Sequence, residues 1–171
     1  MTDIDLTASP EARVRAAIAD LGEREVVDHA IALLAGFNAG EDFLLIAGGK
    51  HAQGLLDGAP PLYWPEVWGA RVLLTAWAPE ATEAITAGLQ NQAWRVREMC
   101  ARVVGVHAVP ARDQLIELLT DDVARVRAVA ARALGAIGTE DDVVILEKLF
   151  RDPEVDTRRA AQQAITAIRA R

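Results

Sequence analysis

The apolar positions between residues 123 and 137 recur with the period of a helix. They are three or four residues apart and share one face, whereas the arginines of the segment lie off that face. Gly138 follows directly and is a typical stop for a helix C-terminus. The pattern predicts an amphipathic helix whose apolar face consists of Val126, Val129, Ala130, Ala133, Leu134 and Ile137.

The same pattern returns along the chain at a step of about 30 residues. Arg97 recurs as Arg127 and then as Arg158, each at the equivalent place in the next copy of the pattern. One step upstream, the segment 69–73 matches the segment 100–104. A period of this length is typical of helical repeat proteins, in which each unit buries its apolar face against its neighbours.

Each repeat also predicts a shorter first helix before the one with the regular pattern. In the last repeat it spans 140–150, and the acids that follow Thr139 suit the positive end of a helix. Pro79 and Pro110 stand at the equivalent helix starts in earlier repeats. Since no segment alternates apolar and polar residues as a strand does, the sequence predicts an all-α fold.

An arginine in the first turn of each second helix follows a polar turn residue by six positions. The pairs are Asn91 with Arg97, Asp121 with Arg127, and Asp152 with Arg158. An aspartate at this place can cap the second helix, and the arginine can reach back toward the same acid. We therefore expect each pair to stabilise its own turn and to recur as a ladder along the array.

The segment from Asp121 to Gly135 resembles the HEAT repeat, and in particular the short type called phycobilisome-lyase HEAT-like repeats. The resemblance covers residues 79–170 and is weaker over 62–78, where Glu66 stands in place of the arginine. It implies a right-handed α-solenoid, a superhelix of helical hairpins, with a protein-interaction role. A minority of relatives attach bilin chromophores to phycobiliproteins, and other HEAT-type arrays handle DNA.

The N-terminal part of the chain departs from the period. Three helices are predicted there, at 10–21, 23–35 and 41–56, and Gly48-Gly49 interrupts the last one. Terminal units of solenoids are commonly atypical, so we interpret this part as an irregular helical N-terminal cap on one continuous solenoid. The expected domains are the cap at 1–61 and HEAT-like repeats at 62–171, divided into 62–78 (partial), 79–108, 109–138 and 139–171.

Charge and composition narrow the function classes. The net charge of −7 divides into −8 over residues 1–85 and +1 over residues 86–171, which disfavours a general binder of nucleic acid or anionic membranes. No apolar run reaches the roughly 18 residues of a membrane-spanning helix, and the first residues lack a secretory leader pattern. One cysteine, Cys100, fits a reducing compartment. We therefore expect the cytoplasm.

Catalytic and metal chemistry find little support in the residue pattern. Gly48-Gly49-Lys50 lacks the first glycine of a phosphate-binding loop, and His51 follows where Ser or Thr would hold magnesium. Cys100 aligns with small residues on a core-facing stripe, which predicts an inert packed thiol. We expect no enzyme activity, no cofactor and no metal site, because no metal-ligand spacing relates the three histidines His29, His51 and His107.

Aromatic and arginine side chains near the start of the second helices are the candidate partner-binding residues. In HEAT arrays the second helices line the concave face, where a partner can bind. Trp68 and Trp77 are instead expected to fill the core. The alternative is core packing for all the aromatics and mutually compensating ion pairs for the arginines. The predicted partner-binding residues are Tyr63, Trp64, Trp94, Arg95, Arg97, Arg125, Arg127 and Arg158, with Arg159 on the same edge.

These features predict a non-catalytic scaffold or adaptor whose concave helix face binds another protein or peptide. An acidic partner would suit the arginines. The first alternative is a lyase-like binder of a tetrapyrrole or other small ligand in the Trp-rich groove. The second is a nucleic-acid binder that acts through the arginine-rich edge. Self-association of the chain stays open.

Overall fold

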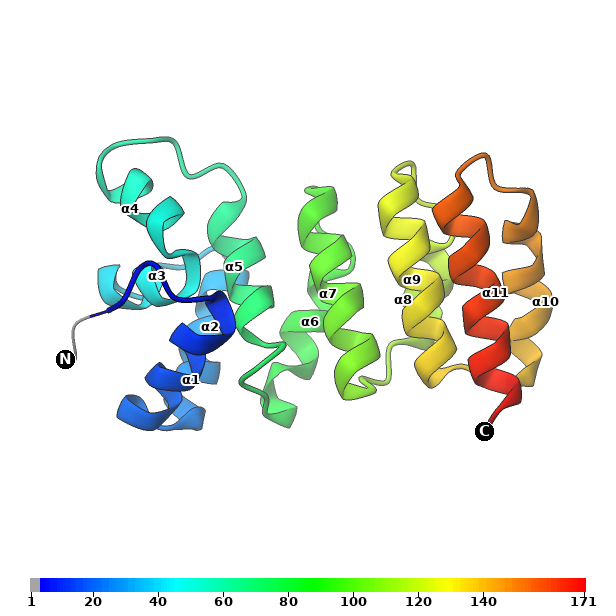
Figure 1. Cartoon of the computed structure of the whole chain (residues 1–171), viewed down its shortest axis with the longest axis horizontal. Coiled ribbons are helices and arrows are strands. Elements are labelled where there is room, and N and C mark those ends of the chain that lie inside the picture. The colour runs from blue at the N-terminus through cyan, green and yellow to red at the C-terminus, as the bar shows by residue number, and fades with distance from the viewer. Residues whose placement is uncertain (1–3) are drawn as a thin grey trace. The chain divides into compact units, whose positions relative to one another are not determined.

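The computed structural model describes residues 4–171, and every regular element within them is a helix. The all-α fold predicted from the sequence is therefore confirmed. The chain forms two compact units, which divide between Ala84 and Ile85. Figure 1 follows the helices in order along the chain.

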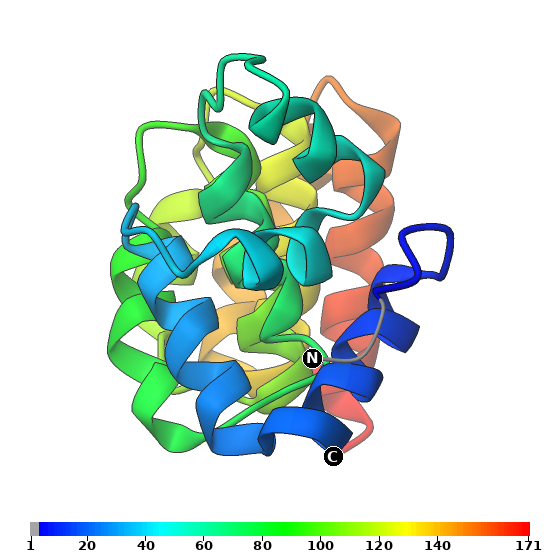
Figure 2. The same cartoon turned by 90° about the vertical axis from the view of Figure 1, so that its left-hand side faces the viewer.

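The first unit packs its helices around α2 and α5. Its elements are α1 (Pro10–Leu21), α2 (Glu23–Leu34), α3 (Glu41–Gly48), α4 (Lys50–Leu56), α5 (Trp64–Val72) and the 3-10 helix η1 (Pro79–Ala81). α5 packs on α2, and α3 contacts both α1 and α5, as Figure 2 shows with this unit toward the viewer. Gly69 permits the close approach of α5 and α2, because a Cβ there would lie 2.6 Å from the backbone nitrogen of Leu34.

The interruption predicted at Gly48-Gly49 separates α3 from α4, so this prediction is confirmed. Gly49 has a φ of 60° and a ψ of −138°, a conformation that residues with a side chain rarely adopt. A Cβ at this position would also lie 2.8 Å from Cζ of Arg13. The glycine therefore ends one helix and leaves room for a buried arginine to pass.

The second unit contains the regular helices of the repeats. α7 (Trp94–His107), α9 (Ala124–Ile137) and α11 (Val155–Arg169) are its long helices. α6 (Thr82–Gly88), within which the two units divide, precedes them. α9 packs against both α7 and α11, and Figure 1 shows the three side by side. α8 (Arg112–Leu118) packs on α9, and α10 (Val143–Glu147) packs on α11. This arrangement is an α-solenoid of helical hairpins.

Two glycines at equivalent repeat positions let the long helices approach closely. A Cβ on Gly105 would lie 3.2 Å from Cα of Ala133, and one on Gly135 would lie 2.7 Å from Cα of Ala164. Both obstacles are backbone atoms, which cannot turn aside as a long side chain can. The recurrence of glycine at this repeat position therefore records a repeated helix–helix contact.

The first helices of the repeats are shorter and less regular than the sequence predicts. The segment 140–150 divides into the 3-10 helix η2 (Glu140–Asp142), α10, and the 3-10 helix η3 (Lys148–Arg151). Pro79 begins η1 as predicted, but the placement of Pro110 at a helix start is wrong. α8 begins only at Arg112, after a tight turn in which the N–H of Ala111 donates to the carbonyl of Val109 at 2.8 Å.

Candidate partner-binding face

Arginines in the first turns of α7 and α9 join successive repeats. Arg97 donates from Nε and Nη2 to the two carboxylate oxygens of Asp121, at 2.7 and 3.0 Å. Arg127 binds Asp152 in the same way, at 2.7 and 2.9 Å. A bidentate arginine–carboxylate pair of this kind is strong and directional. The arginine–carboxylate contacts of the ladder therefore run from one repeat to the next.

The contact predicted inside each repeat is wrong in its atoms. Nη1 of Arg127 donates to the backbone carbonyls of Asp121 and Asp122, at 2.7 and 3.3 Å, and not to the Asp121 carboxylate. Asp121 does not cap α9 either, because its Oδ1 accepts the N–H of Val123 and the helix starts without a side-chain cap. The carbonyl bonds fix one side of the guanidinium, and the other side reaches the next repeat.

Hydrogen bonding between Arg127 and Asp152 shifts the pKa values of both side chains. The hydrogen bonds from Arg127 lower the pKa of Asp152 below its usual range, and the same bonds raise the pKa of Arg127. Only 13% of the Arg127 side chain and 6% of the Asp152 side chain are exposed. The guanidinium of Arg127 is thus occupied inside the protein, and its counterpart in Arg97 is occupied in the same way.

A second inter-repeat pair joins Arg112 to the buried carboxylate of Asp142. Burial raises the pKa of Asp142, but hydrogen bonds from Arg112 and from the backbone N–H of Thr139 outweigh it, so the pKa is lowered overall. Thr139 and Asp142 also form a capping box at the start of η2. The turns of successive repeats are therefore tied at both ends of the first helix.

A shallow groove lies between α7 and α9 and continues toward α11. Its first part has a volume of about 280 Å³, and its second part, of about 400 Å³, shares Arg102, Val129 and Arg132 with the first. Val106 in the first part is an apolar side chain that is 58% exposed. The repeat groove, as we name these two parts, is lined by Glu98, Ala101, Arg102, Gly105, Val106, Ala124, Arg125, Ala128, Val129, Arg132, Ala133, Ala136, Glu154, Asp156 and Thr157.

A buried acid orients two arginines in the repeat groove. Glu98 is 6% exposed and accepts hydrogen bonds from Arg102 at 3.1 Å and from Arg125 at 3.0 Å. Arg132 is exposed and forms no ion pair with any residue that the structure describes. The floor between Arg102 and Arg132 consists of small and apolar side chains. Such a groove can accept an apolar surface that carries negative charge.

The sequence of this chain matches a known protein family. The family described as HEAT repeats matches residues 78–166, which is more than half of the chain. The chain belongs to the HEAT-repeat family. No curated protein matches the chain as a relative. HEAT repeats commonly act as protein-interaction scaffolds and are generally not catalysts.

The predicted aromatic residues make contacts within each unit. In the first unit the rings of Tyr63 and Trp64 lie 5.5 Å apart, and those of Trp64 and Trp68 lie 6.4 Å apart. Trp68 is buried as predicted, whereas Trp77, also predicted to fill the core, is only half-buried, as are Tyr63 and Trp64. In the HEAT repeats of the second unit, the guanidinium of Arg95 lies 4.2 Å from the ring centre of Trp94, a cation–π contact. Partner binding by these residues stays a prediction.

The other predicted arginines occupy different surroundings. Arg125 lines the repeat groove. Arg158 repeats the backbone contacts of Arg127, since its Nη1 donates to the carbonyls of Asp152 and Pro153, but no described carboxylate pairs with it. Arg159 lies 3.9 Å from Asp156 on α11.

The sequence interpretation missed two arginines of the repeat groove, Arg102 and Arg132. They are separated by one repeat step, and this spacing was a signal, because it places both at the same position of successive HEAT repeats. Both lie off the apolar stripe of their helices, however, and an exposed arginine on such a face is also typical of an ordinary solvated surface. Only the groove beside them separates the two interpretations.

None of the residues considered for catalysis and metal binding lines the repeat groove. Cys100 is fully buried, which raises the pKa of its thiol and confirms the prediction of a packed thiol. His29 is packed 4.9 Å from the ring of Phe43. Within residues 4–171, no group of three or more His, Cys, Asp or Glu side chains could hold a metal ion. None of the described helices is both long enough and apolar enough to cross a membrane.

Proposed function

We propose that this protein is a non-catalytic interaction scaffold that binds another protein or peptide on the face formed by α7, α9 and α11. The repeat groove carries this proposal, because it combines an apolar floor with arginines held above it. Membership of the HEAT-repeat family supports it, since solenoids use the face of their stacked helices as an extended binding surface.

The role that we propose differs among the arginines. Arg97 and Arg127 use their guanidinium groups to connect repeats, so we assign them to the framework of the binding face. Arg102, Arg125 and Arg132 project from that framework, and we propose that they attract an acidic partner. Arginines beside an apolar floor can pair with carboxylates at the rim while apolar side chains fill the centre. Tyr63 and Trp64 in the first unit, and Trp94 in the second, remain proposed partner-binding residues.

Charge reversal in the repeat groove tests the proposal. Proteins captured by the purified chain would be compared, by quantitative mass spectrometry, with those captured by the variants Arg102→Glu and Arg132→Glu. We expect both variants to lose a shared set of partners, and addition of salt to weaken the same set in the wild type. Arg151→Glu is the matched control, because Arg151 is exposed in the same unit but does not line the groove. Folded variants that keep every partner would refute the groove as the binding site.

The row of aromatic rings from Tyr63 through Trp64 to Trp68 supports a second candidate function, the handling of a planar ligand such as a tetrapyrrole. Aromatic faces favour stacking with flat conjugated molecules. The resemblance to phycobilisome-lyase HEAT-like repeats points the same way. Absorbance of the purified protein after incubation with a bilin distinguishes this candidate, which fails if no bound chromophore co-elutes with the chain.

Nucleic-acid binding is the less favoured alternative, because the net charge is −7. Salt-dependent retention on DNA or RNA would be required for it. We further propose that residues 1–61 act as a cap on the repeats at 62–171, and that the protein works in the cytoplasm, where a single cysteine stays reduced.

A further inference from the structure

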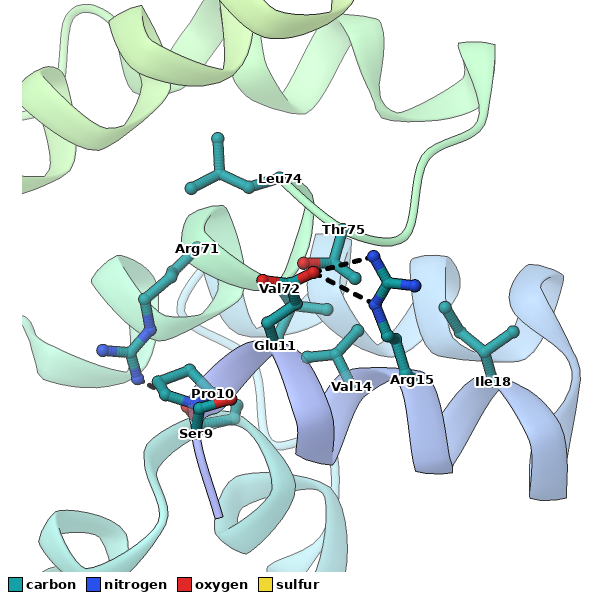
Figure 3. A pocket seen from close by; sticks show the side chains of 11 residues that line it. Ser9, Pro10, Glu11, Val14, Arg15, Ile18, Arg71, Val72, Leu74 and Thr75 are labelled. Atoms are coloured by element: carbon teal, nitrogen blue, oxygen red, sulfur yellow. Dashed lines mark hydrogen bonds and ion pairs between the residues drawn. The ribbon is translucent and has the colours of Figure 1, made fainter.

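The first unit contains a pocket of about 770 Å³ whose lining residues all precede the segment that matches the HEAT-repeat family. α1 and the end of α5 supply most of its wall, and Figure 3 shows the side chains around it. Its volume lies in the range of small-molecule sites, about 300–1,000 Å³. The lining residues are Ser9, Pro10, Glu11, Val14, Arg15, Ile18, Ala47, Arg71, Val72, Leu74 and Thr75.

Among the arginines that line this pocket, Arg71 is the one without a carboxylate partner. Its Nη2 donates to the backbone carbonyl of Ala47 at 2.7 Å, and no residue in the described part of the chain forms an ion pair with it. Figure 3 shows the guanidinium extending toward Ser9 and Pro10. A guanidinium has five N–H donors, so most of those on Arg71 remain available to a ligand.

A second arginine, Arg13, binds beside Arg71, and its charge is partly offset by Asp5. Arg13 is 7% exposed and donates from Nε to the carbonyl of Ile46 at 2.9 Å, beside the carbonyl that Arg71 uses. Both arginines therefore bind the C-terminal turn of α3, which supplies roughly half a negative charge. Burial, with a smaller contribution from Arg13, lowers the pKa of Arg71. An anion beside Arg71 would offset this cost.

The rest of the pocket favours a ligand with an apolar body and a single charge. Val14, Ile18, Val72 and Leu74 provide an aliphatic surface. Arg15 is already paired with Glu11 at 2.7 Å, and the Glu11 carboxylate would repel a ligand with several negative charges. One guanidinium with free donors matches one planar carboxylate.

We propose that this pocket is a binding site for an aliphatic monocarboxylate, with its carboxylate on the free N–H groups of Arg71 and its chain on Val14, Ile18, Val72 and Leu74. The site lies wholly within the first unit and does not depend on partner binding at the repeat groove.

Titration of the isotope-labelled full chain with octanoate tests this site, with backbone amide NMR signals as the readout. We expect saturable shifts of residues in α1 and at the end of α5, and none with octylamine, which has the same chain and the opposite charge. Arg71→Gln should weaken octanoate binding by about tenfold or more, because a charge-assisted hydrogen-bonded pair is lost. Arg24→Gln is the matched control, since Arg24 is exposed in the same unit and lies outside the pocket.

Leu74→Glu provides a second variant in case Arg71→Gln does not fold. An acid in the aliphatic wall should repel octanoate and weaken its binding, although Arg71 is intact. The proposal is overturned if octanoate causes no shifts, if octylamine binds equally well, or if both folded variants keep the wild-type affinity. Shifts confined to α7 and α9 would also overturn it, and they would leave the scaffold function untouched.

Discussion

Arg127 and Asp152 form a bidentate ion pair that connects one repeat to the next. Only 13% of the Arg127 side chain and 6% of the Asp152 side chain are exposed. The same arginine is held by two backbone carbonyls of its own turn. A single guanidinium therefore ties a turn to itself and to its successor. Arg97 repeats this arrangement one unit earlier, with Asp121 as the carboxylate.

Removal of Arg127 should destabilise the second unit strongly. Arg127→Leu leaves the Asp152 carboxylate buried without its partner, and we expect a loss of about 3 kcal/mol in the free energy of unfolding. Urea denaturation followed by circular dichroism measures it. Arg125→Leu, in which the arginine is 67% exposed, should cost less than about 1 kcal/mol. Equal losses in the two variants would contradict a special role for the inter-repeat pair.

The stability of the protein should depend on pH through Asp152. Because Arg127 lowers its pKa in the folded state, the carboxylate contributes stability that is fully present above its usual pKa of 3.8. That contribution is lost as the pH falls through the lowered value. Asp152→Asn should therefore reduce the dependence of unfolding free energy on pH below about 4, measured by urea denaturation at a series of pH values. Asp122→Asn, at an exposed position, should leave the dependence near that of the wild type.

The long helices should tolerate no side chain at Gly135. The Cβ of an alanine there would lie 2.7 Å from Cα of Ala164, so the helices must move apart, and we expect a loss of about 1–3 kcal/mol. Thermal unfolding gives the comparison with Gly54→Ala in α4, where nothing lies within 4 Å of the new Cβ. Alanine should be neutral or slightly stabilising at that position. A stable Gly135→Ala variant would mean that α9 and α11 approach less closely.

Cys100 should react with thiol reagents only when the second unit opens. Its side chain is fully buried and its pKa is raised by burial, so little reactive thiolate exists in the folded protein. Labelling with a maleimide should be slow in buffer and rapid in about 6 M urea, a concentration that unfolds most small domains. Fast labelling of the native protein would show that α7 opens readily, which mass spectrometry would detect directly.

The sequence predicts the regular part of this fold well because the repeats are redundant. The apolar stripe of α9 and the glycines at 105 and 135 recur at one spacing, so each copy supports the interpretation of the others. Arg127 reaches back to Asp121 as predicted, but to its backbone carbonyl, and the carboxylate that pairs with Arg127 is that of Asp152. Asp121 and Asp152 stand at the same position of successive repeats. The repeat spacing is therefore compatible with an ion pair between Arg127 and either aspartate. Only the fold shows which carboxylate is within reach.

The pocket in the first unit could not be predicted from periodicity, because α1 and α3, which form part of its wall, lie outside the repeat. Arg71 is separated from Ala47 by 24 positions and Arg13 from Ile46 by 33 positions. In the sequence, Gly48-Gly49 indicates only a helix break. That two arginines converge on the end of the interrupted helix depends on how α1, α3 and α5 pack.

The direction of the arginine ladder affects how this protein could be rebuilt. Arg97 and Arg127 each donate to the aspartate in the turn of the following repeat. The ladder therefore has a direction along the chain. A hairpin excised at its turns and grafted elsewhere would lose the acceptor of its own arginine and would remove the donor for its own aspartate. An engineered extension placed after α11 should therefore carry an aspartate in its turn, where Arg158 already has its backbone contacts. The interchangeable module is the junction between two repeats, and not the hairpin itself.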